Sequence, residues 1–211
     1  MVVVRKRKVY EVPARHHGSE AKELAIKEVW KSRKAYLKKQ LEEAFFHLGR
    51  ALHYIHDSCL ERGLFFDRHD EVEKALDELS KETIEDEKAV VEYFEKPIED
   101  PIQLEKLISD IEAESKADKA LIKASQLTGQ VAASILLNKP CPQSYIEEHK
   151  KAKETRDNTA IICAIAAALS LPLAYLNAAF TAIVLLAAMI AYAVVEAAYR
   201  EAKKRVEWYR T

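Results

Sequence analysis

The stretch AFFHLGRALHYIHD, residues 44–57, places three histidines and one aspartate in an otherwise apolar segment. His53 and Asp57 are four positions apart, so on a helix they lie on the same face. An imidazole nitrogen and a carboxylate oxygen one turn apart can bind the same metal ion. His69 and Glu73 repeat this spacing further along the chain. Two such pairs predict a metal site, with zinc as the ion that these donors suit and manganese or iron as alternatives.

The first pair requires a helix over residues 41–60, and the apolar residues along it predict which face is buried. They recur at alternating spacings of four and three positions: Leu41, Phe45, Leu48, Leu52 and Ile55. Gly49 lies one turn before His53, on the line of the metal pair. A glycine inside a helix costs about 1 kcal/mol relative to alanine, so Gly49 is expected to leave room for a close neighbour.

The rest of the chain is also expected to be helical. Only four glycines and six prolines occur in 211 residues, and period-2 alternation is confined to VVVRKRKVYEV at the start. Apolar periodicity and capping residues predict further helices over 19–39, 69–93 and 102–138, and another that begins near Tyr145. The predicted fold class is therefore all-α, a multi-helix bundle with a C-terminal hydrophobic helical hairpin. His47 is expected to be partly buried, and His56 and His149 to be solvated.

The near-neutral formal charge of −1 conceals a segregation of charge along the chain. Residues 1–40 carry twelve Lys and Arg against four Asp and Glu, whereas residues 61–118 carry eight against twenty. Such asymmetry either steers an anionic ligand to one end of the protein or lets oppositely charged helices lie side by side.

The cysteines and the N-terminus predict the compartment. Three cysteines, Cys59, Cys141 and Cys163, have no paired spacing, which indicates a reducing compartment without a disulfide framework. No apolar run of signal-peptide length follows the basic residues at 5–8. We therefore expect a cytoplasmic protein that is not secreted.

An uncharged run of 38 residues, 158–195, sets the C-terminal part of the chain apart. Pro172 and Asn177 divide it into two apolar segments, each just under the ~20 residues that span a bilayer as a helix. Lysines and arginines flank the run on both sides, which favours a membrane-inserted hairpin whose two ends stay in the cytoplasm. We therefore predict a helical metal-binding domain over 1–157 and a hydrophobic hairpin with a basic tail over 158–211. The alternative is an alanine-rich helical pair buried in the bundle or in a homo-oligomer.

The run AFFHLGRALHYIHD also resembles the signature helix of the zinc-dependent phospholipase C and single-strand nuclease superfamily. In that family AFF, an aromatic residue and LG are followed by LHY, two further residues and an aspartate. The matching positions are Ala44–Phe46, Leu48–Gly49, Leu52–Tyr54 and Asp57, with His47 in the aromatic place. A second family motif, a histidine followed four positions later by a glutamate, matches His69 and Glu73.

The resemblance implies a set of zinc ligands. In chain order they are His17 (or His16), His53, Asp57, His69 and Glu73. Asp57 would bridge two ions in a site of one to three zinc ions. The family's Pro-any-His element between the two motifs is absent, so Cys59, Glu61 or Asp67 would have to replace its histidine. No aspartate matches the general base of the family.

The function that the resemblance implies is metal-dependent hydrolysis of a phosphoric ester, with a phospholipid or another phosphodiester as substrate. Two ions would polarise a phosphoryl oxygen and hold a hydroxide ready to attack phosphorus. The alternative is a non-catalytic, metal-stapled helical module that serves as a membrane-associated scaffold. A di-iron carboxylate protein is excluded because no Glu-any-any-His sequence occurs in the chain.

Overall fold

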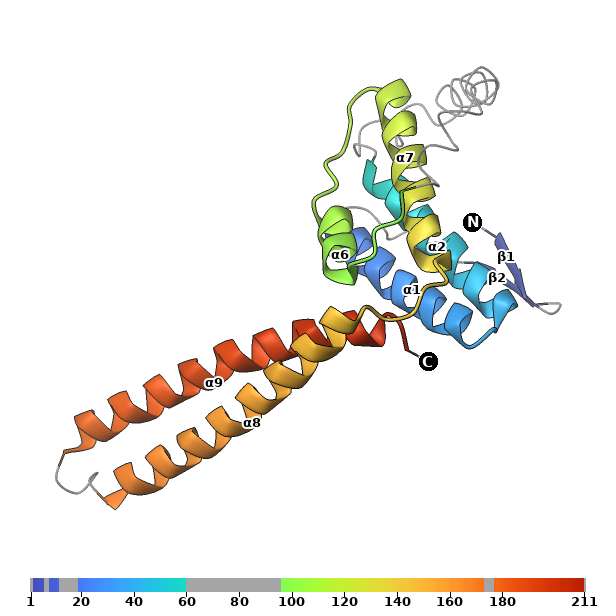
Figure 1. The fold of residues 1–211 in the computed structure, drawn as a ribbon. Coiled ribbons are helices and arrows are strands. Elements are labelled where there is room, and N and C mark those ends of the chain that lie inside the picture. The colour runs from blue at the N-terminus through green and yellow to red at the C-terminus, as the bar shows by residue number, and fades with distance from the viewer. Residues whose placement is uncertain (1, 6–7, 12–18, 60–95, 173–176, 211) are drawn as a thin grey trace. The chain divides into compact units, whose positions relative to one another are not determined.

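The structure is a computed structural model that describes residues 2–5, 8–11, 19–59, 96–172 and 177–210. Its elements are β1 Val2–Arg5, β2 Lys8–Glu11, α1 Ser19–Leu37, α2 Leu41–Cys59, α6 Pro101–Ser109, α7 Ala117–Leu136, α8 Gln143–Ser170 and α9 Ala178–Glu207 (Figure 1). Helices dominate, and the predicted all-α class is confirmed. The run with period-2 alternation forms a short antiparallel hairpin in which Val3 pairs with Tyr10. The helix predicted over 69–93 lies outside the described residues.

The chain forms two compact units. The first contains β1, β2, α1, α2, α7 and most of α6, and the second contains residues 100–102 and 138–211. The structure therefore divides after Leu137, whereas the sequence predicts a boundary between residues 157 and 158. Helix α8 runs through that predicted boundary without a break, because a change from charged to apolar side chains does not interrupt a helical backbone.

The core of the first unit is built on close packing between α1 and α2. The buried stripe of α2 consists of Ala44, Leu48, Ala51 and Ile55. It is rotated from the predicted stripe, since Leu41 and Phe45 are each 53% exposed. Alanines on this face, and the buried Ala25 of α1, are small enough to let two helices approach closely. Across this contact Ser32 donates a hydrogen bond from Oγ to the carbonyl of Ala44 at 2.8 Å.

The segment predicted as one helix over 102–138 forms two helices, α6 and α7. Residues 110–116, between the two helices, are not helical because their backbone makes tertiary contacts instead. Ile111 is buried in the core, and the backbone N–H of Glu114 donates to the carbonyl of Cys59 at the end of α2 at 2.8 Å. These contacts replace hydrogen bonds within a continuous helix, and local periodicity does not reveal them.

The second unit is an antiparallel pair of long helices, α8 and α9 (Figure 1). At its charged end, Arg205 on α9 forms ion pairs with two carboxylates. The Arg205 Nε lies 3.2 Å from Asp100 Oδ2, and its Nη1 lies 2.8 Å from Glu148 Oε1 on α8. The guanidinium also lies over the ring of Tyr145, 5.8 Å from its centroid. The two apolar halves extend from this charged end to the connection at residues 171–177.

Candidate functional site

His53 and Asp57 lie next to each other on α2, as their spacing predicts. His53 Nε2 is 3.4 Å from Asp57 Oδ2, and the two side chains are 37% and 13% exposed. This separation is longer than an N–H···O hydrogen bond of about 2.7–3.2 Å. It matches the distance between two ligand atoms on one tetrahedral zinc ion, which is about 3.4 Å when the metal–ligand bonds are about 2.1 Å. The pair therefore has a geometry that fits two adjacent ligands of one ion, accessible to solvent from the side of His53.

The remaining predicted ligands lie outside the described residues: His17, His16, His69 and Glu73, together with the substitutes Glu61 and Asp67. Within the described ranges, no three His, Cys, Asp or Glu side chains come together in a group that would hold a metal. Cys59 is described and is fully buried, and burial raises the pKa of its thiol to about 11. Cys59 lies two positions after Asp57, at the end of α2, and it stays a candidate to replace the family histidine.

Two other histidines of α2 have partners on neighbouring helices. His47 is 12% exposed, in agreement with its predicted partial burial, and its Nδ1 lies 2.5 Å from Glu28 Oε2 on α1. His56 is exposed, and its Nε2 lies 2.9 Å from the hydroxyl of Thr128 on α7. Both side chains therefore join α2 to its neighbours.

Glu28 is the centre of a buried charged cluster that the sequence analysis missed. Glu28 is 1% exposed, its Oε1 accepts a hydrogen bond from Lys31 Nζ at 2.7 Å, and its Oε2 lies 3.8 Å from Arg50 Nε. Burial alone would raise the pKa of Glu28, but the hydrogen bonds with Lys31 and His47 and the charge of Arg50 lower it. The sequence did contain a signal. Glu28 follows Ala25 by three positions on the inward face of α1, where a carboxylate must be paired.

Gly49 has open space beside it. A Cβ atom placed on Gly49 would meet nothing within 4 Å. The close neighbour expected at this glycine is therefore absent from the part of the chain that the structure describes.

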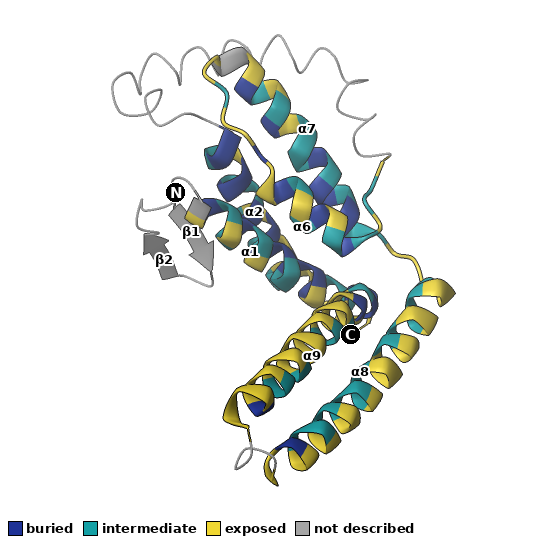
Figure 2. Cartoon of the chain, turned by 90° about the vertical axis from the view of Figure 1, so that its left-hand side faces the viewer, coloured by how far each residue is buried: buried dark blue, intermediate teal, exposed yellow. Residues whose placement is uncertain are grey.

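Many residues of α8 and α9 in the halves nearest the connection are exposed (Figure 2), and large apolar side chains are among them. Those that are more than half exposed are Ile161, Ile162, Ile165, Leu169, Phe180, Ile183, Leu186, Met189, Ile190 and Val194. The residues between the helices are smaller. Cys163 faces Ala188, with its Sγ donating to the Ala188 carbonyl at 3.3 Å, and Ser170 faces Thr181. This distribution inverts the usual pattern of a water-soluble helix pair, in which large apolar residues are buried and small or polar ones are exposed.

The polar groups at the tip of the α8–α9 pair make hydrogen bonds within the pair. The Thr181 hydroxyl donates to the carbonyl of Ser170 at 3.2 Å, and the Ser170 hydroxyl donates to the carbonyl of Ala167 at 3.0 Å. At the start of α9, the Asn177 side chain accepts a hydrogen bond from the backbone N–H of Phe180 at 3.1 Å. These polar groups therefore do not depend on water for a partner.

Within the described residues, one helix is long and apolar enough to cross a membrane. It is α9, whose most apolar 18-residue window has a mean hydropathy of 2.5 and is only 6% buried. The uncharged part of α8 extends only from residue 158 to its end at Ser170, so α8 contains no comparable window.

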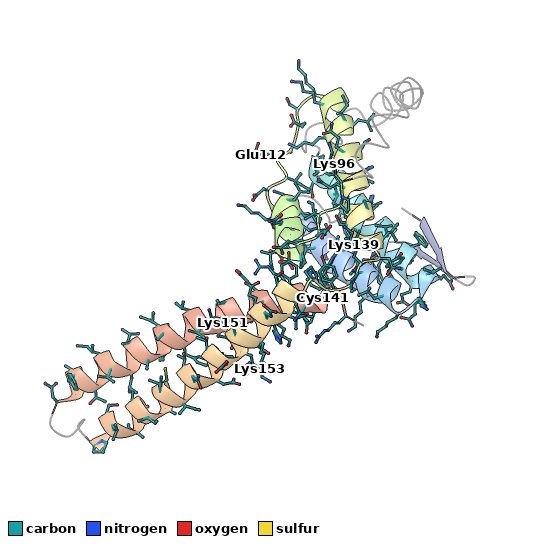
Figure 3. All side chains as sticks on the ribbon, in the orientation of Figure 1. Lys96, Glu112, Lys139, Cys141, Lys151 and Lys153 are labelled. Atoms are coloured by element: carbon teal, nitrogen blue, oxygen red, sulfur yellow. The ribbon has the colours of Figure 1, made fainter. Side chains whose placement is uncertain are left out.

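Aromatic and cationic side chains mark the point where the apolar halves meet the charged halves. The Arg156 guanidinium lies over the ring of Tyr199, 4.1 Å from its centroid. His149 stacks on the same ring with centroids 5.5 Å apart, so it is partly covered rather than fully solvated as predicted. Lys151 and Lys153, which lie between His149 and Arg156 on α8, are exposed (Figure 3).

Comparison with protein-family models, with curated proteins and with solved structures finds no match to this chain. Its function must therefore be inferred from the His53–Asp57 pair and from the exposed apolar helices themselves.

Proposed function

We propose that the chain is a membrane-anchored helical protein whose α8–α9 hairpin inserts in a lipid bilayer. The observation that carries the proposal is the inverted packing of this pair. Large residues such as Leu186 and Met189 face outward, where water would oppose them, while the small residues Cys163 and Ala188 meet between the helices. In a bilayer the acyl chains solvate the large side chains, and small residues allow the two helices to pack closely.

The hydrogen bonds at the tip of the hairpin also support the proposal that it lies in a lipid bilayer. A hydroxyl or amide without a partner is expensive in hydrocarbon, since no water can replace the missing bond. Thr181, Ser170 and Asn177 each have a partner inside the hairpin. A hairpin exposed to water would not need this internal pairing.

The lengths of the apolar halves support a hairpin with both ends on one membrane face. The uncharged part of α9, residues 178–195, extends about 27 Å at 1.5 Å per residue, close to the ~30 Å hydrocarbon core. The uncharged part of α8, residues 158–170, extends about 20 Å. Tyr199 and Arg156, at the boundary with the charged halves, would lie among the lipid head groups, where aromatic and basic residues are favoured.

Membrane fractionation of full-length protein tests the proposal. We expect the full chain to stay in the membrane fraction after a high-salt wash. Leu186→Lys together with Met189→Lys should release it or cause it to aggregate, because each lysine near the centre of a spanning helix costs about 2.5–3.5 kcal/mol of insertion free energy. Ala197→Lys is the control for position, since it adds one lysine at an exposed site in the charged half of α9.

Two outcomes would contradict membrane insertion. One is a full chain that is soluble without detergent and sediments as a dimer, in which case the apolar surface is covered by a second copy. The other is a doubly substituted chain that remains in the membrane fraction as firmly as the Ala197→Lys control.

A second candidate function, hydrolysis of a phosphoric ester, is favoured by the geometry of His53 and Asp57. Their 3.4 Å separation suits two ligands of one zinc ion. His17, His69 and Glu73 would complete the ligand set. When bound, the metal would supply a Lewis acid for the phosphoryl oxygen and an activated water. A membrane-inserted hairpin would suit a phospholipid substrate.

Elemental analysis of protein purified without chelator tests the metal site. We expect His53→Ala to lose most of the bound zinc, while His149→Ala, whose imidazole stacks on Tyr199, should retain it. Hydrolysis of a generic phosphodiester, with and without chelator, then separates an enzyme from a metal-stapled module. Wild-type metal content in His53→Ala, or a wild type that binds no metal, would mean that His53 and Asp57 are structural.

A further inference from the structure

The end of α1 and the start of α2 line a surface cavity of about 380 Å³ that is open to solvent. It is lined by residues of α1, of the connection and of α2: Lys31, Lys34, Ala35, Lys38, Gln40, Glu43 and His47. Lys31 and Lys34 are three residues apart on α1, and Lys38 follows directly after the end of the helix. The backbone N–H of Lys38 donates to the carbonyl of Lys34 at 3.3 Å, so the three lysines form one stripe. None of these residues belongs to the His53–Asp57 pair or to the hairpin, so this lysine cavity is a separate site.

The charges of the lysine cavity favour an anion. Lys31 is held by Glu28 at 2.7 Å, and Glu43 lies 3.4 Å from His47 Nε2. Lys34 and Lys38 are exposed at the edge of the cavity, and their ammonium groups outweigh the single carboxylate of the lining. The placement of lysines near the C-terminus of α1 is also favourable for that helix, whose dipole is negative there. Helix stabilisation alone, however, does not require a cavity beside them.

We propose that the lysine cavity binds a phosphate group, carried either by a small soluble molecule or by a lipid head group. Lysine ammonium groups are compact charges that donate readily to phosphate oxygens. The Gln40 amide, on the connection between the helices, supplies a neutral donor in the same lining. The volume lies in the range of small-ligand sites, roughly 300–1,000 Å³. The excess of basic residues over residues 1–40 would attract such a ligand.

Calorimetric titration of inorganic phosphate into the full chain, held in phosphatidylcholine nanodiscs, tests this site. We expect saturable binding that Lys34→Gln weakens by about tenfold, the loss typical of one charge-assisted contact. Lys27→Gln is the matched control. It removes the same charge from the same face of α1, two turns earlier and outside the cavity, and should change the affinity less than about twofold.

Two results would overturn the proposal: no saturable binding of phosphate, or equal weakening by Lys34→Gln and Lys27→Gln, which would indicate only a general effect of charge. Repeating the titration in nanodiscs that contain phosphatidic acid distinguishes the two sources of the phosphate. Weaker binding of free phosphate to the wild type, but not to Lys34→Gln, would show that a lipid head group occupies the cavity. Unchanged binding would assign it to a soluble ligand. If the hairpin does not insert, the same titration is run in buffer, so the two proposals fail independently.

Discussion

Glu28 shows how one side chain can decide the stability of the first unit. Its carboxylate is almost fully buried between α1 and α2 and is surrounded by Lys31, His47 and Arg50. A buried carboxylate is compatible with a stable fold only while its partners remain. Removing one member of a buried charged cluster leaves the others desolvated and unpaired, which lowers the free energy of unfolding. Glu28 therefore couples the packing of two helices to the ionisation of a single carboxyl group.

We predict that Glu28→Gln destabilises the protein by about 3 kcal/mol at neutral pH, the range typical of breaking a buried ion pair. Because the pKa of Glu28 is lowered from its ordinary value of 4.5, its contribution is fully present above that value and is lost as the pH falls below it. Denaturant unfolding of detergent-solubilised protein at several pH values should show this loss in the wild type and not in Glu28→Gln.

Glu23→Gln is the control for this prediction, because Glu23 is exposed on the same helix. It should leave both the stability and its dependence on pH close to the wild type. Equal behaviour of the two variants would mean that the charged cluster contributes nothing specific.

At the scale of the elements, the connection between α1 and α2 contains a residue in an unfavourable conformation. Lys39 has a φ of 58°, in the left-handed region that favours glycine. Its backbone N–H donates to the carbonyl of Tyr36, and that of Gln40 donates to the carbonyl of Ala35, both at 2.9 Å. These bonds close the end of α1 and determine where α2 begins, so the strain at Lys39 is offset by an ordered helix end.

Replacing Lys39 with glycine should therefore stabilise the first unit, by up to about 1 kcal/mol, because glycine adopts positive φ without the steric penalty of a Cβ atom. Lys38→Gly is the matched control. It removes the same charge one position earlier, where φ is not positive, and should destabilise instead. Thermal unfolding in detergent distinguishes the two, and a fall in the midpoint for both variants would contradict the assignment.

At the scale of the whole molecule, the chain consists of two compact units that differ in what surrounds their apolar residues. The first unit buries residues such as Ile55 and Ile108 within the protein. The α8–α9 hairpin exposes residues of the same size. The first unit should therefore be sensitive to denaturant in the ordinary way, whereas the hairpin should depend on lipid or detergent.

We predict that urea unfolds the protein in micelles in two steps, with the helical signal of the hairpin remaining after the first. Far-UV circular dichroism measures the residual helix, and limited proteolysis should leave a protected fragment that contains residues 158–195. The Leu186→Lys and Met189→Lys double variant should lose both the second step and the protected fragment. A single transition in the wild type would contradict this separation.

Several features of the protein were determined by the sequence alone. The all-α class follows from apolar periodicity and from the scarcity of glycine and proline, which act locally. The adjacency of His53 and Asp57 follows from helical geometry, since residues four positions apart must share a face. The uncharged run over 158–195 predicts the apolar halves of α8 and α9 because charge and hydropathy are properties of the residues themselves.

Other features were decided only by tertiary structure. The buried face of α2 contains Ala44 and Ala51 instead of Leu41 and Phe45, because α1 packs closely only against small side chains. The break between α6 and α7 depends on a hydrogen bond from Glu114 to Cys59. The pairing of Glu28 and His47, 19 positions apart, joins two helices. Each depends on contacts between residues distant in sequence, and local propensity and spacing do not specify such contacts.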